Sequence, residues 1–323
     1  MGNYLDATNE LYTEAALTPD VGLCCTTTPI WQLPELDMPD IMLQMNYGCG
    51  STVNPRDLIN NPTVLYVGVG GGMELLQFAY FNRNKSGVIG VDVLDEMLDA
   101  SKKNFAEAEK LNPWFKSEFV DLRKGDALNL PIEDETIDVA AQNCVFNIFK
   151  LDDLKKALSE TYRVLKPRGR LVMSDPTCEQ EMPTELRNDD RLRALCLSGS
   201  IPLQEYLDVI ASVGFGTIEV RAKRAYRVLS PEHYNTKELI YIESVEVCAI
   251  KDPMPEDGPC IFTGKTAIYF GKEELFDDNQ GHILMQNQPL AICDKTAKDL
   301  KALNKKDIYI SESTYFYDGG GCC

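Results

Sequence analysis

Short apolar runs alternate with segments of helical periodicity through the first two thirds of the chain. The apolar runs have the length and the β-branched content of buried strands; they occupy 63–70, 86–93, 119–124, 136–148 and 170–176. The segments between them place apolar residues three and four positions apart, as on one face of a helix; they occupy 71–81, 94–111 and 153–166. This alternation predicts an α/β fold with a mostly parallel, Rossmann-like sheet and helices on both faces.

The regular alternation of strands and helices is absent on either side of this region. Residues 1–62 precede the first strand and carry three cysteines, and we expect them to form an N-terminal cap. The predicted main domain runs over 63–245. A segment rich in proline and acid follows it, and then shorter β-type runs with one helix near 296–305. We therefore predict a small α+β C-terminal domain over 246–323, ending in a mobile glycine-rich tail with the last two cysteines.

Charge and export signals narrow the functional classes. The formal net charge is −18, which argues against nucleic acid and against an anionic membrane surface, because both need basic patches. The apolar runs are too short for a membrane span, and the acidic N-terminus lacks the features of a signal peptide. We expect a cytoplasmic protein, with a monomer as the default state.

The cysteines are the most informative residue type. There are eleven of them, an odd number in a chain without an export signal, which predicts free thiols in a reducing compartment. The chain has no CxxC pair and only two histidines, His233 and His282. A zinc site and a serine–histidine–aspartate triad are therefore not expected.

The glycine run of 67–72 predicts where a nucleotide-like cofactor binds. Glycines after the first strand allow a tight turn and a close backbone approach to a ligand. Asp92 ends the second strand about twenty residues later, where a carboxylate accepts hydrogen bonds from a ribose diol. Asp126 follows the third strand, where its carboxylate can accept a hydrogen bond from an adenine amino group. Met73 occupies the third glycine position of a phosphate-binding motif, which favours a cofactor that presents no phosphate there.

The segment RVLKPRGRLV at 163–172 is similar to the helix-turn-strand that follows the fourth strand in class I S-adenosylmethionine methyltransferases. Together with the glycines and the two acids it predicts methyl transfer. The predicted cofactor-binding residues are Gly68, Gly70, Asp92, Val93, Asp126, Ala127 and Asn143. Such enzymes commonly carry an acid where this chain has Tyr66, so the contact at the methionine end of the cofactor is expected to differ.

Several cysteine motifs sharpen this interpretation. Cys144 follows the fourth strand in QNCVFNI, Cys49 lies in NYGCG, and Cys196 lies in LCLSGS; LCCTTTP precedes them and GGGCC ends the chain. With these motifs the chain resembles the arsenite S-adenosylmethionine methyltransferases, the family often called ArsM, and within it the cyanobacterial branch linked to arsenosugar synthesis. The resemblance runs over most of the chain.

The resemblance implies a specific chemistry. It implies that Cys49, Cys144 and Cys196 hold arsenic(III) as a trithiolate beside the cofactor, which methylates it for detoxification. It also implies that Cys24 or Cys25 is a partner in disulfide exchange. Thioredoxin or glutathione would then reset the enzyme, and arsenite or its thiol conjugates would be the substrate.

Two alternatives stay open. One is a methyltransferase for carbon, oxygen or nitrogen with incidental cysteines, and the other is a non-catalytic metalloid-binding or sensing protein. The remaining thiols are expected to be structural, with a capture role open for the last two; they are Cys178, Cys248, Cys260, Cys293, Cys322 and Cys323.

Overall fold

A single eight-stranded sheet organises the larger part of the protein. The computed structural model describes residues 3–20, 23 and 31–315. The order of the strands across the sheet is β3-β2-β1-β4-β5-β7-β6-β8. The strands are β1 (Val64–Val67), β2 (Val88–Asp92), β3 (Val120–Lys124), β4 (Ile137–Asn143), β5 (Leu165–Cys178), β6 (Thr217–Leu229), β7 (Ile240–Ile250) and β8 (Cys260–Phe262).

The first five strands run parallel, and β7 pairs antiparallel with both β5 and β6. Because the chain order reverses between β1 and β4, the carboxyl ends of those two strands form the switch point at which such sheets bind ligands. The predicted α/β architecture is confirmed.

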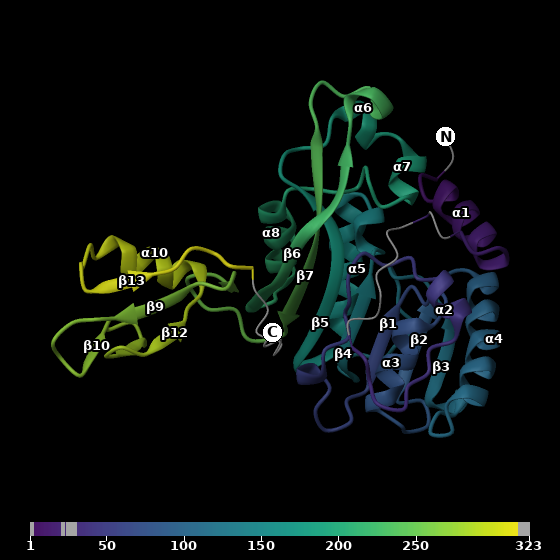
Figure 1. The fold of residues 1–323 in the computed structure, drawn as a ribbon, viewed down its shortest axis with the longest axis horizontal. Helices are drawn as coiled ribbons and strands as arrows, with labels where there is room; N and C mark the ends of the chain where they lie inside the picture. The colour runs from purple at the N-terminus through teal and green to yellow at the C-terminus, as the bar shows by residue number, and fades with distance from the viewer. Residues whose placement is uncertain (1–2, 21–22, 24–30, 316–323) are drawn as a thin grey trace.

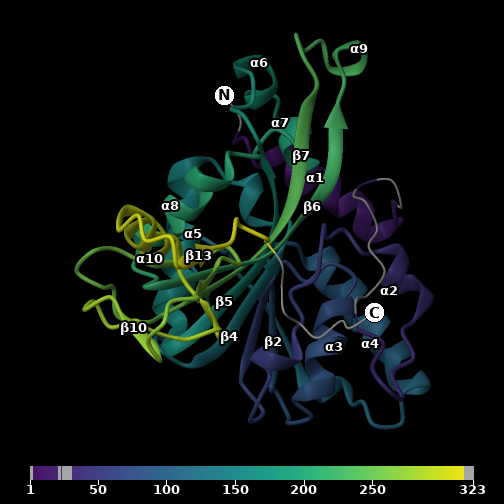
Figure 2. The same ribbon diagram turned by 60° about the vertical axis from the view of Figure 1, so that its left-hand side comes forward.

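Helices cover both faces of this sheet (Figures 1 and 2). The long ones are α1 (Asp6–Leu17), α3 (Met73–Phe81), α4 (Asp95–Leu111), α5 (Leu151–Val164) and α8 (Leu203–Val213). The short ones are α2 (Asp40–Gln44), α6 (Thr184–Arg187), α7 (Asp190–Ala194) and α9 (Pro231–Tyr234), with single 3-10 turns η1 (Pro55–Asp57), η2 (Ser117–Phe119) and η3 (Phe146–Ile148). Within the described residues, no helix has the length and apolarity that a membrane crossing needs.

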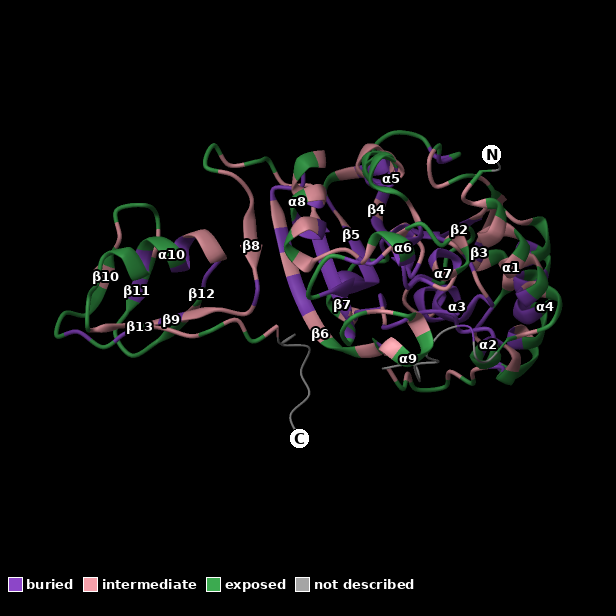
Figure 3. Ribbon diagram, turned by 90° about the horizontal axis from the view of Figure 1, so that it is seen from above, coloured by how far each residue is buried: buried purple, intermediate pink, exposed green. Residues whose placement is uncertain are grey.

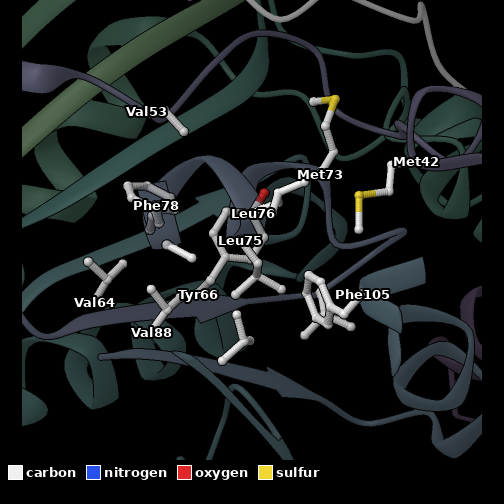
Figure 4. Close-up of a cluster of buried hydrophobic side chains, with 14 of the residues drawn as sticks. Met42, Val53, Val64, Tyr66, Met73, Leu75, Leu76, Phe78, Val88 and Phe105 are labelled. Carbon is white, nitrogen blue, oxygen red and sulfur yellow. The ribbon is translucent and has the colours of Figure 1, made fainter. Parts of the chain in front are cut away.

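The alternation of side chains along the strands builds two separate cores. Val64 and Tyr66 of β1 point into the core under α3 and α4, whereas Leu65 and Val67 point into the core under α5 and α8. Figure 4 shows the first of these cores, with Phe78 of α3 close to the β1 side chains. Because helices cover both faces of the sheet, the side chains on both faces are apolar, and each strand is a continuous apolar run in the sequence.

A small second unit follows β8. It contains β9 (Thr266–Tyr269), β10 (Leu275–Asp277), β11 (Ile283–Met285), β12 (Pro289–Ala291), α10 (Asp294–Ala302) and β13 (Ile308–Ile310), with its own apolar core under α10. Figure 3 shows it as a projection beside the buried central sheet. The predicted boundary at 245/246 falls inside β7, and β8, which follows the proline-rich segment, still pairs with β6 of the main sheet.

A buried ion pair fastens the segment before β1 to the sheet. Asp57 is 6% exposed and accepts hydrogen bonds from Arg170 of β5 and from Arg221 of β6, which is 7% exposed. Burial alone would raise the pKa of Asp57, but the hydrogen bonds and charges of the two arginines hold it below its ordinary value.

Replacing Asp57 by Asn should therefore remove the buried partner of Arg221 and leave it the more exposed Glu219, which contacts its Nε at 3.0 Å. We expect the free energy of unfolding to fall by about 3 kcal/mol in urea titrations. Asp134→Asn is the matched control, because Asp134 pairs with Arg163 at 2.6 Å but its side chain is 74% exposed. The free energy of unfolding of Asp134→Asn should fall by no more than about 1 kcal/mol. Equal losses in the two variants would show that burial does not decide the contribution of Asp57.

Candidate active site

A cavity of about 260 Å³ opens at the carboxyl ends of β1, β2 and β4. Its walls come from the glycine loop after β1, the turns after β2 and β3, the end of β4, and α1. All seven residues predicted to bind the cofactor line it: Gly68, Gly70, Asp92, Val93, Asp126, Ala127 and Asn143. Residues far apart in sequence therefore meet at the predicted place.

The glycine loop is shaped by sterics and fixed by α4. Gly68 has a φ of +81°, and a β-carbon there would lie 2.5 Å from a methyl group of Val145. Two polar side chains of α4 donate hydrogen bonds to loop carbonyls: Ser101 to Gly70 at 2.7 Å, and Asn104 to Gly71 at 2.9 Å. The backbone can therefore line the cavity without a side chain in the way.

Asp92 is held in place by backbone amides on both sides. Its carboxylate accepts hydrogen bonds from the Val69 amide at 2.9 Å and from the Leu94 amide at 3.0 Å, one on each oxygen. Burial raises the pKa of Asp92 to about 6, although these amides act in the opposite direction. Each oxygen keeps a lone pair with which it can accept a hydrogen bond from a ligand.

Glu74, from the first turn of α3, was not identified from the sequence. It is 4% exposed, lines the cavity, and accepts hydrogen bonds from the Thr52 amide at 2.8 Å, from Tyr66 at 2.5 Å and from Asn143 at 3.2 Å. Tyr66 occupies the position where an acid was expected, and its hydroxyl donates to this carboxylate. Burial, and then the charge of Glu74, raise the pKa of Tyr66 well above its ordinary value. An acid is thus present beside the glycine loop, but it comes from the helix instead of the strand.

The three cysteines predicted as arsenic ligands lie in one buried cluster. Cys49 is 1% exposed, Cys144 is 2% exposed and Cys196 is fully buried, and they share this cluster with Ile148. The Cys196 thiol donates to the Cys144 carbonyl at 3.1 Å, and Cys144 also lines the cavity. The thiol cluster and the cavity therefore adjoin at the end of β4.

Two of these cysteines have an unusual backbone. Cys144 and Cys196 both have a φ of +58°, in the left-handed region that non-glycine residues rarely adopt. Such residues cost on the order of 1–3 kcal/mol each and concentrate at functional sites. Hydrogen bonds compensate at Cys144, since its amide donates to the Ser174 carbonyl at 2.8 Å and the next amide, of Val145, donates to the Gln142 side chain at 2.9 Å.

Asn143 joins the Cys49 turn to the end of β4. Its side-chain oxygen accepts from the Cys49 amide at 2.9 Å, and its side-chain nitrogen donates to the Gly50 carbonyl at 2.9 Å. A β-carbon on Gly48 would lie 2.5 Å from this side chain. The Cys49 turn can approach β4 this closely because residue 48 is glycine.

A buried polar network of side chains supports the turn at Cys144 through Gln142. Asp175 of β5 accepts hydrogen bonds from Gln142 and from Tyr206 of α8, the latter at 2.5 Å. Burial raises the pKa of Asp175 to about 7, against the effect of these donors. The network fixes Gln142, whose other end holds the amides that follow Cys144.

Helix α1 closes the outer side of the cavity. Thr8 lines the cavity, and its hydroxyl is buried without a hydrogen-bond partner in the described part of the chain. Tyr12 also lines it and lies 3.9 Å from the Cys196 thiol. Cys24 and Cys25, the predicted disulfide-exchange residues, lie outside the described residues, as do Cys322 and Cys323.

The thiols are not arranged as a preformed metal site. Among the described residues, no three histidine, cysteine, aspartate or glutamate side chains stand ready to hold a metal ion. Cys144 and Cys196 meet through a carbonyl, and Cys49 lies 3.4 Å from the Ser174 hydroxyl. Joint binding of one atom by the three thiols therefore requires their side chains to turn from these partners.

Comparisons with known proteins show which proteins the chain is similar to. The family model described as a methyltransferase domain matches residues 65–173. Arsenite methyltransferases match the chain with 30% identity in Aquipseudomonas alcaligenes, over 66% of this chain and 59% of the relative, and with 28% identity in Halobacterium salinarum, over 55% and 44%. The chain thus spans about half the length of these curated relatives.

One solved structure resembles most of the chain. It is the crystal structure of an arsenic(III) S-adenosylmethionine methyltransferase from Chlamydomonas reinhardtii, with a TM-score of 0.57, 21% identity, and coverage of 87% of this chain and 95% of that one. At this identity the likeness concerns the fold. The chain therefore has the class I S-adenosylmethionine methyltransferase fold, and its sequence is similar to those of arsenite methyltransferases.

Proposed function

We propose that this protein binds S-adenosylmethionine in the cavity and methylates trivalent arsenic held by Cys49, Cys144 and Cys196. The residues that line the cavity fit this cofactor. The Asp92 oxygens can accept from its ribose hydroxyls, and the unpartnered Thr8 hydroxyl offers a further polar contact. When bound, the cofactor supplies an electrophilic methyl group on a positively charged sulfur.

Glu74 extends this fit to the methionine end of the cofactor. Its carboxylate is buried among neutral donors and forms no ion pair within the described part of the chain. A buried anion of this kind favours a cationic ligand, such as an ammonium group, over a neutral one. Related enzymes commonly carry an acid where this chain has Tyr66. We assign the role of that acid, contact with the methionine end of the cofactor, to Glu74.

The observation that carries the arsenic assignment is the shared buried cluster of the three thiols beside the cavity. Thiolates are soft ligands, and trivalent arsenic is a thiophilic centre. Three thiols react with arsenite by replacing its three oxygens, which leave as water. The arsenic lone pair that remains is the nucleophile, so the chain contributes positioning and exclusion of water more than acid–base catalysis.

The oxidation states require a further thiol reaction. Methylation raises arsenic formally from the trivalent to the pentavalent state. Two thiolates can return two electrons to it by joining in a disulfide, which an external thiol such as glutathione or thioredoxin must then reduce. We propose Cys24 or Cys25 as one partner in that disulfide, on the family resemblance, and a reducing cytoplasmic setting for the enzyme.

A methylation assay with arsenite, labelled S-adenosylmethionine and a thiol reductant tests this proposal. We expect wild type to form labelled methylarsenicals and Cys144→Ser to be slower by about 100-fold or more, because an arsenic held by two thiols is misplaced. Cys178→Ser is the matched control. Cys178 is also buried and donates to the Ser200 carbonyl at 3.3 Å, a bond that serine can keep.

The alternatives give different results in the same assay. Equal activity of wild type and Cys144→Ser would contradict the thiol assignment. Arsenite binding without any methyl transfer would support a sensing protein. Methylation of a carbon, oxygen or nitrogen acceptor that proceeds equally in both proteins would support the other class of methyltransferase.

Cofactor binding should depend on pH through Asp92. With its pKa near 6, the carboxyl group becomes protonated as the pH falls through that value and loses acceptor strength for the ribose hydroxyls. Calorimetry between about pH 5 and about pH 8 should show affinity falling on the acid side in wild type. Asp92→Asn should bind more weakly with little pH dependence, and Asp126→Asn should keep the wild-type profile. A flat wild-type profile would contradict this role.

Replacing Glu74 by Gln tests the role of the buried acid. We expect the dissociation constant of S-adenosylmethionine to rise by about tenfold or more, because a charge-assisted contact is lost. Methylthioadenosine, which shares the adenosine part but lacks the amino-acid end, should bind equally well to wild type and variant. An equal weakening of both ligands would show that Glu74 only supports the fold.

A further inference from the structure

One buried side chain joins the two turns that carry Cys144 and Cys196. Asn147 lies in η3, shortly after Cys144, and is 3% exposed. Its side-chain nitrogen donates a hydrogen bond to the Cys196 carbonyl at 3.0 Å. Because the two cysteines are 52 positions apart, this bond joins distant segments of the chain at two of the residues that we assign to arsenic.

The turn that carries Asn147 is fixed by the main sheet. The Asn147 amide donates to the carboxylate of Asp175 in β5 at 3.4 Å. The side-chain oxygen of Gln142 in β4 accepts from the amides of Val145 and Phe146, at 2.9 and 3.2 Å. Asn147 therefore projects from a turn that two strands hold in place, and its side chain can act as a fixed support for a second segment.

The loop after α7, which carries Cys196, packs directly against this turn. A β-carbon on Gly199 would lie 1.7 Å from the Asn147 carbonyl oxygen, far inside van der Waals contact, so the loop can approach this closely only with glycine there. The buried guanidinium of Arg193 adds longer bonds to the next two carbonyls of the turn, at 3.4 Å each. The loop is thus attached at several points, and among these bonds the one from Asn147 ends on a cysteine.

The bond to Asn147 controls the direction of the Cys196 side chain. Cys196 has a φ of +58°, a conformation that non-glycine residues rarely keep without support. Its amide donates to the Arg193 carbonyl at 2.9 Å, and its carbonyl accepts from Asn147. These two bonds fix the peptide planes on either side of the residue. Because those planes determine where the bond from Cα to Cβ points, they also determine where the thiol lies.

The amide group of Asn147 is costly to bury. Its side-chain oxygen is buried and has no hydrogen-bond partner among the residues that the structure describes. A buried acceptor without a partner costs free energy that an apolar side chain of similar shape would avoid. Packing alone does not explain an amide at this position, whereas the donor bond to the Cys196 carbonyl does.

We propose that Asn147 is a positioning residue that holds the Cys196 thiol beside Cys144 for joint binding of trivalent arsenic. This inference rests on the proposed function and adds what keeps two of its three thiols together. Without the donor, the Cys196 carbonyl and its peptide plane can turn, and the thiol leaves the place from which it reaches arsenic. The cofactor side of the turn should keep its structure, because Gln142 holds it independently.

Separate measurements of arsenite and cofactor binding to the reduced full chain test the proposal. Asn147→Leu keeps a branched side chain and removes the donor. We expect its dissociation constant for arsenite, from equilibrium dialysis, to rise by about tenfold or more, and its affinity for S-adenosylmethionine, from calorimetry, to stay unchanged. Asn82→Leu is the matched control. Asn82 is 2% exposed and its side chain also donates to carbonyls, those of Pro62 and Gly87, but these precede β1 and β2 at the amino ends of the strands.

Gly199→Ala tests the same contact from the other side, also if Asn147→Leu fails to fold. Its methyl group would push the Cys196 loop away from the Asn147 carbonyl, so arsenite binding should weaken while cofactor binding is kept. Equal weakening of arsenite binding by Asn147→Leu and Asn82→Leu, or wild-type arsenite affinity in both Asn147→Leu and Gly199→Ala, would overturn the role of Asn147 alone. Wild type that binds no arsenite would instead contradict the proposed function.

Discussion

The amide side chain of Asn143 is the contact on which the candidate active site depends. It holds the Cys49 turn against the end of β4, and it also donates to Glu74. The contact joins distant parts of the chain, because Cys49 precedes the first strand and lies 95 positions before Cys144. One side chain thus brings together the thiols and the acid that we assign to the cofactor.

Local signals were enough to predict the fold and to name residues that line one cavity at the ends of the strands. The alternation of strands and helices, the glycines after β1 and the acid at the end of β2 each depend on neighbouring residues, so the sequence reveals them. The grouping of Cys49, Cys144 and Cys196 required a family resemblance, because it depends on the contacts of Asn143 and on two left-handed turns. No periodicity reports such contacts.

Other features could not be predicted for the same reason. In the sequence, Glu74 is indistinguishable from an ordinary helical residue, and only the packing of α3 directs its side chain toward Tyr66. The one available signal is its place at the start of a helix after a glycine run. The pairing of β8 with β6 is likewise a tertiary event.

The most direct test of the central claim is X-ray absorption spectroscopy of the arsenite-loaded protein. It counts the sulfur and oxygen neighbours of arsenic without requiring turnover. We expect three sulfur neighbours in wild type, and two sulfurs with one oxygen in Cys144→Ser. Arsenic that keeps oxygen neighbours in wild type, or that has the same neighbours in both proteins, would contradict the assignment of Cys49, Cys144 and Cys196 as a joint arsenic site.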